Sequence, residues 1–437
     1  MAKIIVIFCL VFFLIALFTE PRKLNPLTLF LGEWAVIVYL ANLNLYGLYS
    51  TSEATYTVIL IGCICFVLGF YLVKFFRNIN KNRKLSNSRG STTEYELNFK
   101  LVTFLSVITI IYFSVDFFNS LIYLLQGQSL GYIRQLAQQG ALFSNPIMNA
   151  IRILITAPFA TVLIYVVASN YFSMKRNNFL MFSVAIILIF RLLSDGGRSP
   201  LIYLSLSFLI SYLYSGVKKN RVLNYKNDSN KLILRLSKYH LFMILFILII
   251  AISLYSITLS RSGAESIRYT YYYFAMQPYM LELWSKKVVI NHLIGFGMSS
   301  LNGILFPIFY VLSNFIPFMN YPETWRQVYD VLESTGTDWQ VITQYGTTAN
   351  SYISIFWSLY YDGRLVGVVL GMILVGVAMG YSYYKVLDFP NQKNIAIFSA
   401  LMIGLFYSFQ QLITQNIYWT MSFVFLIFVV YKKKERL

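Results

Sequence analysis

Residues 364–385 read RLVGVVLGMILVGVAMGYSYYK, and charged side chains stand only at the two ends, Arg364 and Lys385. A bilayer core about 30 Å thick is crossed by a helix of about 20 apolar residues, so this stretch predicts a membrane span. Small residues recur along it and predict a face that another helix approaches closely. These residues are Gly363, Gly367, Gly371, Gly376 and Gly380.

Comparable runs occur along the whole chain of 437 residues, of which 58% are hydrophobic and 12% charged. Soluble chains are about 25% charged, so the composition excludes a soluble enzyme and a disordered protein. It predicts an all-α polytopic membrane protein with about 11 transmembrane helices. The other ten runs are 4–18, 27–46, 54–76, 101–124, 150–171, 179–194, 199–216, 239–260, 394–412 and 415–431. The first is followed by TEPRKLN rather than a small-residue cleavage site, so we expect a retained helix.

The net charge is +18, and the basic residues are concentrated in a few loops. Loops 77–98, 173–178 and 217–238 and the C-terminal tail are rich in Lys and Arg, which marks the cytoplasmic side of a membrane. We therefore expect these basic residues to contact membrane lipids, and we expect no nucleic-acid partner. The alternation of spans then places 126–148, 194–198 and 261–363 outside.

Segment 261–363 is the longest without a clear span, and its charges are nearly balanced. Within it, 295–318 (GFGMSSLNGILFPIFYVLSNFIPF) is apolar but interrupted by glycine and proline, which favours a re-entrant or interfacial segment. If it spans, 351–362 spans too, which gives thirteen passes and an acidic cytoplasmic loop. The predicted organisation is an eight-helix region at 1–260, a large external loop at 261–363 and a three-helix region at 364–437.

The absence of several catalytic motifs excludes the corresponding classes of enzyme. The sequence holds no GxxxxGK[ST], HExxH, GxSxG or Asp-x-Asp, so no nucleotide or metal cofactor is expected. The two histidines, His240 and His292, are predicted on opposite sides of the membrane. The three cysteines lie in apolar runs and predict neither a zinc site nor a disulfide. Any catalysis then depends on arginine, tyrosine and carboxylate side chains.

The turn Ser194-Asp195-Gly196-Gly197-Arg198 is the first candidate site. Its glycines allow backbone amides to face an anion, and Arg198 can hold a phosphate bidentately. The alternative is a tight turn with an Arg198–Asp195 ion pair.

A second candidate follows the predicted span 239–260. Arg261, Glu265, Arg268 and Tyr272 are spaced to share one helix face. Two arginines can bind a diphosphate, and Glu265 can act as a base; the alternative is a row of surface ion pairs. The run Tyr271-Tyr272-Tyr273 beside them can stack against sugars. His292 is the second candidate for the base.

Weaker signals come from Arg134 in the loop QGQSLGYIRQLAQQG and from Asn350, Tyr352 and Asp362 at the end of the large loop. Asp362 could instead cap the following helix. Glu33 and Asp116 lie inside apolar runs, where pairing between helices is the preferred explanation.

With these residues in place, the chain resembles the O-antigen polymerases, the Wzy-type oligosaccharide repeat-unit polymerases. The resemblance rests on the layout of many spans with one large loop, and on four stretches. They are GGRSP (196–200), SRSGAESIRYTYYYF (260–274), GFGMSSLNGI (295–304) and NSYISIFWSLYYDGRLVG (350–367). The chain departs from the family in two ways. Tyr361-Asp362-Gly363 lacks the residue that separates Asp from Gly in the family's Tyr-Asp-x-Gly-like pattern, and the chain has no second large external loop.

The resemblance implies a metal-independent glycosyltransferase of the GT-C kind, acting at the periplasmic face of a bacterial inner membrane. Donor and acceptor would be glycans linked to undecaprenyl diphosphate, and a chain-length regulator protein is an expected partner. An O-antigen ligase and a lipid-linked oligosaccharide flippase or transporter are the alternatives. Transporters usually show internal repeats, and this sequence shows none.

Overall fold

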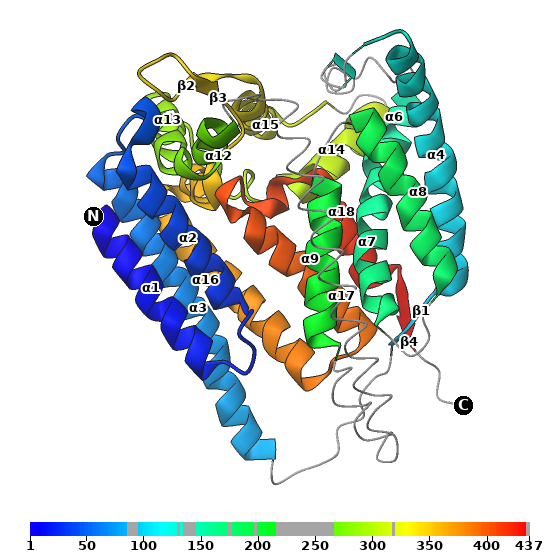
Figure 1. The fold of residues 1–437 in the computed structure, drawn as a ribbon, viewed down its shortest axis with the longest axis horizontal. Helices are drawn as coiled ribbons and strands as arrows, with labels where there is room; N and C mark the ends of the chain where they lie inside the picture. The colour runs from blue at the N-terminus through cyan, green and yellow to red at the C-terminus, as the bar shows by residue number, and fades with distance from the viewer. Residues whose placement is uncertain are drawn as a thin grey trace. The chain divides into compact units, whose positions relative to one another are not determined.

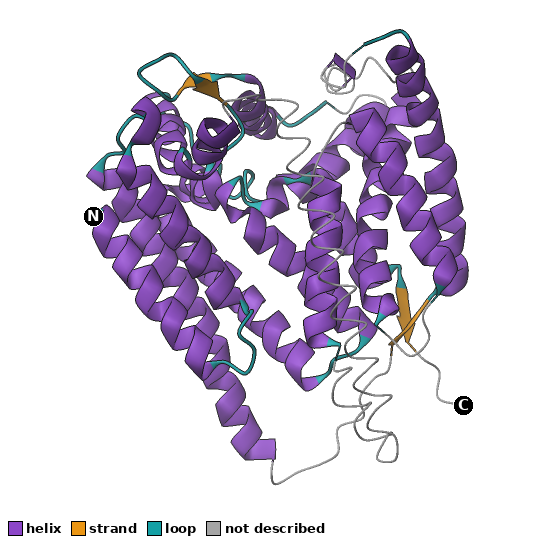
Figure 2. Cartoon of the chain, in the orientation of Figure 1, coloured by secondary structure: helices purple, strands orange, loops and turns teal. Residues whose placement is uncertain are grey.

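The computed structural model describes residues 1–84, 95–128, 132–133, 146–172, 177–195, 199–215, 266–316 and 320–433. These residues form helices almost throughout, with two short two-stranded sheets, which confirms the predicted all-α class (Figures 1 and 2). The chain divides into two compact units that are described separately. Unit 1 comprises residues 1–90, 262–384 and 404–420, and unit 2 comprises 91–261, 385–403 and 421–437.

Among the described residues, six helical stretches are long and apolar enough to span a membrane, so the chain is a multi-pass membrane protein. They are α1 (Ala2–Thr19), α2 (Pro26–Leu43), Glu53–Ile79 within α3 (Glu53–Lys84), α4 (Phe99–Leu125), Ile147–Tyr171 and α16 (Ser354–Asp388). Shorter helices match the predicted spans near 179, 199, 394 and 415. They are α8 (Asn178–Asp195), α9 (Ser199–Tyr214), α17 (Gln392–Phe406) and α18 (Ile417–Phe428). The predicted span 239–260 lies outside the described residues.

In unit 1, α1 and α2 form a hairpin that packs with α3 (Figure 1). The turn between α1 and α2 is fixed at both ends. Asn25 caps α2 by accepting a hydrogen bond from the Thr28 amide at 3.0 Å. Glu20, whose side chain is buried, pairs with Lys74 of α3 at 2.7 Å and accepts a hydrogen bond from the Tyr384 hydroxyl at 3.2 Å. The buried carboxylate is thus satisfied by a cation and a hydroxyl.

Helices α3 and α16 approach each other through glycines. A side chain at Gly376 would collide with the Phe66 carbonyl, and one at Gly69 with the Ile373 carbonyl. At Gly380 a Cβ would lie 3.2 Å from the Phe70 carbonyl oxygen. The close helix contact predicted from the glycine spacing is therefore present at Gly376 and Gly380.

Helix α16 is broken at Gly363 and Arg364, where Arg364 has φ 54° and ψ −141°. The carbonyl of Leu359 lies against Gly367 and its side chain against Gly371. In an unbroken helix, Leu359 and Gly371 would be about 18 Å apart along the axis. The chain therefore turns sharply here, and the break coincides with the predicted start of the span at residue 364.

The described part of the predicted large loop holds the helices α12 (Ser266–Ala275), α13 (Gln277–Ile290), α14 (Asn302–Phe315) and α15 (Glu323–Thr337), a hairpin of strands β2 (Gln340–Val341) and β3 (Thr348–Ala349), and the first turns of α16. Buried Trp325 of α15 stacks with Tyr329 and packs on Phe306 and Phe309 of α14. Helix α14 is about 21 Å long, short of the about 30 Å bilayer core. The re-entrant or interfacial placement of 295–318 stays a prediction.

In unit 2, α4 packs with α8 through stacked Phe117 and Phe190 rings, whose centroids are 4.7 Å apart. The stretch Ile147–Tyr171 consists of α6 (Pro146–Ile151), the π-helical turn η2 (Arg152–Thr156) and α7 (Ala157–Tyr171), and nearly all of α7 is buried. Strand β1 (Tyr95–Leu97) pairs antiparallel with β4 (Tyr431–Lys433).

Candidate functional site

A polar junction surrounds Asp362, immediately before the break in α16. One carboxylate oxygen accepts a hydrogen bond from the Ser299 amide at 2.9 Å. The other accepts from the Ser300 amide at 2.8 Å and from the Ser300 hydroxyl. A side chain at Gly295 would collide with this carboxylate, which explains why glycine suits that position. The segment 295–300 is thus folded around Asp362, and these residues are called the Asp362 junction below.

A third segment of chain completes the Asp362 junction. The 3₁₀ turn η5 (Ile413–Gln415) precedes α18. The side-chain amide of Gln415 donates to the Ser299 hydroxyl at 3.0 Å and to the Ser358 hydroxyl. The Thr414 hydroxyl donates to the Ser300 carbonyl at 2.6 Å. Residues from three distant parts of the sequence therefore form one hydrogen-bonded network, in which Ser299 binds Asp362 through its backbone amide and Gln415 through its hydroxyl.

Arg364 fixes the neighbouring end of α13. One of its guanidinium nitrogens donates to the Leu293 carbonyl at 2.7 Å and to the Val288 carbonyl at 3.1 Å. The guanidinium carbon also lies 5.6 Å from the centre of the Tyr360 ring. Helix C-terminal carbonyls attract cations, so Arg364 acts as a cap on α13. Asp362 and Arg364 together hold the segment 288–300 at both ends.

The tyrosines of α12 divide into two groups. Tyr271 and Tyr272 are buried, and their hydroxyls donate to the carbonyls of Leu40 and Tyr46, each at 2.8 Å. These bonds fasten α12 to the end of α2 and to the turn η1 (Leu45–Gly47). The exposed rings are those of Tyr269 and Tyr273.

Tyr352 links α12 to the region after α17. Its ring lies 5.5 Å from Tyr273 and stacks on Phe409 of the turn η4 (Tyr407–Phe409) at 6.0 Å. Phe409 is buried and Tyr352 is half-buried, so Tyr273 is the most exposed of these three rings. The predicted roles of Tyr271, Tyr272 and Tyr352 in sugar binding stay predictions.

The remaining predicted site residues are placed separately. Arg268 of α12 lies over the Tyr269 ring, with 5.6 Å between the guanidinium carbon and the ring centre. His292 is exposed and has φ 50° just after α13. Asn350 donates to the Gly336 carbonyl. Four further residues lie outside the described residues, namely Arg134, Arg198, Arg261 and Glu265, so the predicted arginine cluster stays a prediction.

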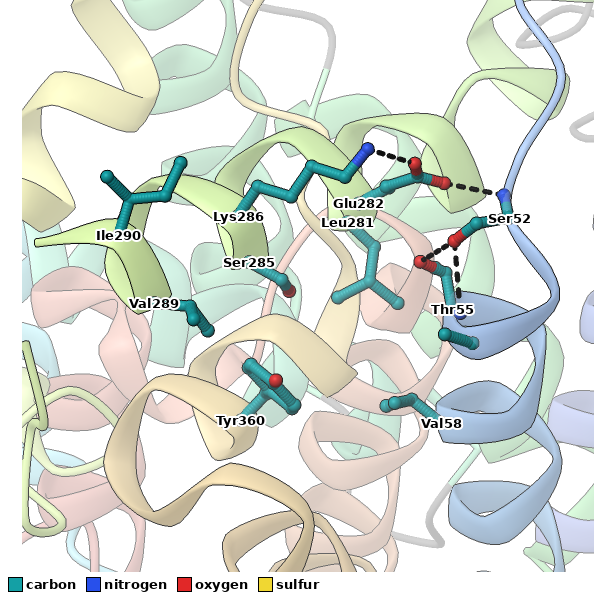
Figure 3. A pocket seen from close by; sticks show the side chains of 11 residues that line it. Ser52, Thr55, Val58, Leu281, Glu282, Ser285, Lys286, Val289, Ile290 and Tyr360 are labelled. Carbon is teal, nitrogen blue, oxygen red and sulfur yellow. Dashed lines mark hydrogen bonds and ion pairs between the residues drawn. The ribbon is translucent and has the colours of Figure 1, made fainter. Parts of the chain in front are cut away.

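A cavity of about 230 Å³ lies between α3, α13 and Tyr360 (Figure 3). Buried Glu282 binds the Lys286 ammonium group at 2.6 Å and the Ser52 amide at 2.6 Å. Burial alone would raise the pKa of the Glu282 carboxyl, but the hydrogen bonds from Lys286 and Ser52 outweigh it and hold that pKa below its usual range. Glu282 is therefore ionised at neutral pH.

Sequence reasoning missed Arg364, Gln415 and Ser300 as parts of a site. Each carried a weak signal, because each is a polar residue in or beside an apolar run. In the described parts of the chain, no cluster of His, Cys, Asp and Glu could hold a metal ion. Among protein-family models, curated proteins and solved structures, nothing matches this chain significantly.

Proposed function

We propose that this membrane protein is a polymerase that joins undecaprenyl-diphosphate-linked oligosaccharide repeat units into a polysaccharide at the periplasmic face of a bacterial inner membrane. The products would be O-antigen or capsule-like chains. The reaction would transfer the growing glycan from its diphosphate to a hydroxyl of the next unit.

One observation carries the proposal. Two of the four stretches on which the resemblance rests, residues 295–304 and 350–367, are bound to each other through Asp362 and Ser300. A third stretch, 260–274, contributes Tyr273, whose ring contacts Tyr352 of the second. Three stretches that are far apart in the sequence are thus in contact within unit 1, and this contact supports the proposal.

The chemistry needs few components. The donor is activated by its own diphosphate, so no nucleotide is required. Arginines can stabilise the negative charge that develops on the leaving diphosphate, and a carboxylate can take the proton of the acceptor hydroxyl. The oxygens of Asp362 already accept three hydrogen bonds, so we assign Asp362 to positioning and keep Glu265 as the proposed base, with His292 as the second candidate.

Deletion of the gene tests the proposal when surface glycan length is resolved on a gel. A polymerase mutant keeps one-unit chains and loses long ones. Loss of all surface glycan would instead indicate a ligase or a flippase, and unchanged glycans would exclude all three. Complementation with the wild-type chain controls for effects on neighbouring genes.

A further inference from the structure

The cavity between α3 and α13 has two chemically different sides. Lys286, Glu282 and Ser52 stand along one side, and Val58 and Tyr360 lie on the other (Figure 3). Leu281 and Val289 add to the apolar part of the lining. A ligand that fits such a cavity has a polar end and a hydrocarbon end.

The position of the cavity indicates a ligand from the membrane. The candidate span of α3 begins at Glu53, so Ser52 and Val58 mark the end of a span and its first turns. On α13, Val289 is 43% exposed and Ile290 is 73% exposed, and both line the cavity. Apolar side chains exposed at the end of a span are stable when lipid covers them.

The polar side provides donors that suit a phosphate. The Lys286 side chain is 63% exposed, so its ammonium group reaches both the cavity and the solvent. The hydroxyl of Ser285 also lines the cavity and can donate a hydrogen bond. An ammonium group with a nearby hydroxyl binds a phosphate through charge-assisted hydrogen bonds.

We propose that this cavity binds the phosphate end of the isoprenyl carrier lipid, with Lys286 on the phosphate and the first part of the chain against Val58 and Leu281. The inference rests on the proposed function, which supplies the carrier. A volume of about 230 Å³ admits only a segment of such a lipid, so the rest of the chain stays in the bilayer.

Neutralising Glu282 should change the binding affinity in a direction that distinguishes a phosphate from other ligands. Its carboxylate holds the Lys286 ammonium group in place but also repels a phosphate. Glu282→Gln keeps an oxygen that can accept from the Ser52 amide and removes the negative charge. Phosphate binding should therefore become several-fold tighter in this variant. A site for a sugar or an amine, which would use the carboxylate directly, predicts weaker binding instead.

The test measures binding of undecaprenyl phosphate to the purified full-length protein in phosphatidylcholine nanodiscs. Lys286→Ala should weaken binding by about tenfold or more, the loss expected for one charge-assisted hydrogen bond. Ser285→Trp, which fills the cavity, should do the same. Lys287→Ala is the matched control, because Lys287 pairs with Asp338 at 3.1 Å and lies over Trp284. Undecaprenol and inorganic phosphate, each lacking one half of the ligand, should compete poorly.

Unchanged binding in both Lys286→Ala and Ser285→Trp would overturn the proposal, as would weaker binding in Glu282→Gln. Equal competition by phosphatidylglycerol would show a general anionic-lipid site and also overturn it. The binding assay does not depend on polymerisation. Binding that needs Lys286, in a protein whose deletion leaves glycan length unchanged, would reject the proposed function and keep the site.

Discussion

Asp362 binds Ser300 twice, accepting one hydrogen bond from its amide at 2.8 Å and another from its hydroxyl, across 62 positions of sequence. The carboxylate lies directly before the break in α16, and Ser300 lies just before α14 begins. This relationship ties the turn of one helix to the start of another. The geometry of the proposed site therefore depends on Asp362 even if no substrate contacts it.

The first prediction concerns this tether. Asp362→Ala leaves the Ser299 and Ser300 amides without their acceptor, and each hydrogen bond to a charged group contributes about 1.5–3 kcal/mol. We expect the free energy of unfolding to fall by about 2–4 kcal/mol and long glycan chains to be lost. Thermal unfolding in detergent and glycan gels measure the two effects.

Asp338→Ala is the matched control for Asp362→Ala. Asp338 forms an exposed pair with Lys287, and such pairs contribute about 0–1 kcal/mol. Equal unfolding temperatures for Asp362→Ala and Asp338→Ala would show that the Asp362 hydrogen bonds do not hold this segment.

The second prediction compares two glycines of α16. A methyl group at Gly376 meets the Phe66 carbonyl of α3, and overpacking of this kind costs about 1–3 kcal/mol. At Gly363 the described part of the chain places no atom within 4 Å of the added carbon, apart from the adjacent residues and backbone of the same helix. Gly376→Ala should therefore lower the unfolding temperature, and Gly363→Ala should change it little. The reverse order would contradict the α3–α16 packing.

This pair of glycines also shows what the sequence could predict. Regular glycine spacing and hydropathy predicted a span that another helix approaches, and that is found at Gly376 and Gly380. The same spacing could not show that Gly367 and Gly371 face Leu359 of their own helix. That contact depends on a break in which Arg364, a residue that rarely takes positive φ, has φ 54°.

The site shows the same division between local and distant information. The sequence placed aromatic rings on 269–273, but which rings are buried depends on the carbonyls of Leu40 and Tyr46, about 230 residues away. Likewise, the sequence predicts Asp362 at a helix start, whereas its partners Ser299 and Ser300 belong to another segment. Periodic patterns report a residue's own helix, and tertiary hydrogen bonds do not follow from them.

The third prediction is a dependence of stability on pH through Glu282. Its pKa is lowered in the folded protein, so its contribution is present above the usual value of 4.5 and is lost as the pH falls through the lowered pKa. Glu282→Gln should unfold at a lower temperature than wild type near neutral pH. The difference should shrink as the pH falls below 4.5. Glu323→Gln, at an exposed position, provides the control. A difference in unfolding temperature between Glu282→Gln and wild type that does not depend on pH would contradict the ionised pair.

The last prediction concerns Arg198, Arg261, Arg268 and Glu265. We propose that the three arginines hold the donor and acceptor diphosphates and that Glu265 is the base. Lysine keeps the charge but loses the planar fork that binds two phosphate oxygens. Arg→Lys at 261 or 268 should therefore impair polymerisation, and Arg→Ala should nearly abolish it. Glu265→Gln should slow the reaction by about 10²–10⁴ while substrate still binds.

Glycan length at matched protein levels decides among the outcomes, with Arg326→Ala on the exposed face of α15 as the control. Normal polymerisation by Glu265→Gln together with an inactive His292→Ala would move the base to His292. Unchanged chain length in both Arg198→Ala and Arg261→Ala would reject the diphosphate clamp. Each arginine variant removes a single positive charge, and so does Arg326→Ala. Loss of long glycan chains at Arg198, Arg261 and Arg268 but not at Arg326 would therefore indicate that these three arginines bind a common substrate. It would not be explained by a general loss of positive charge.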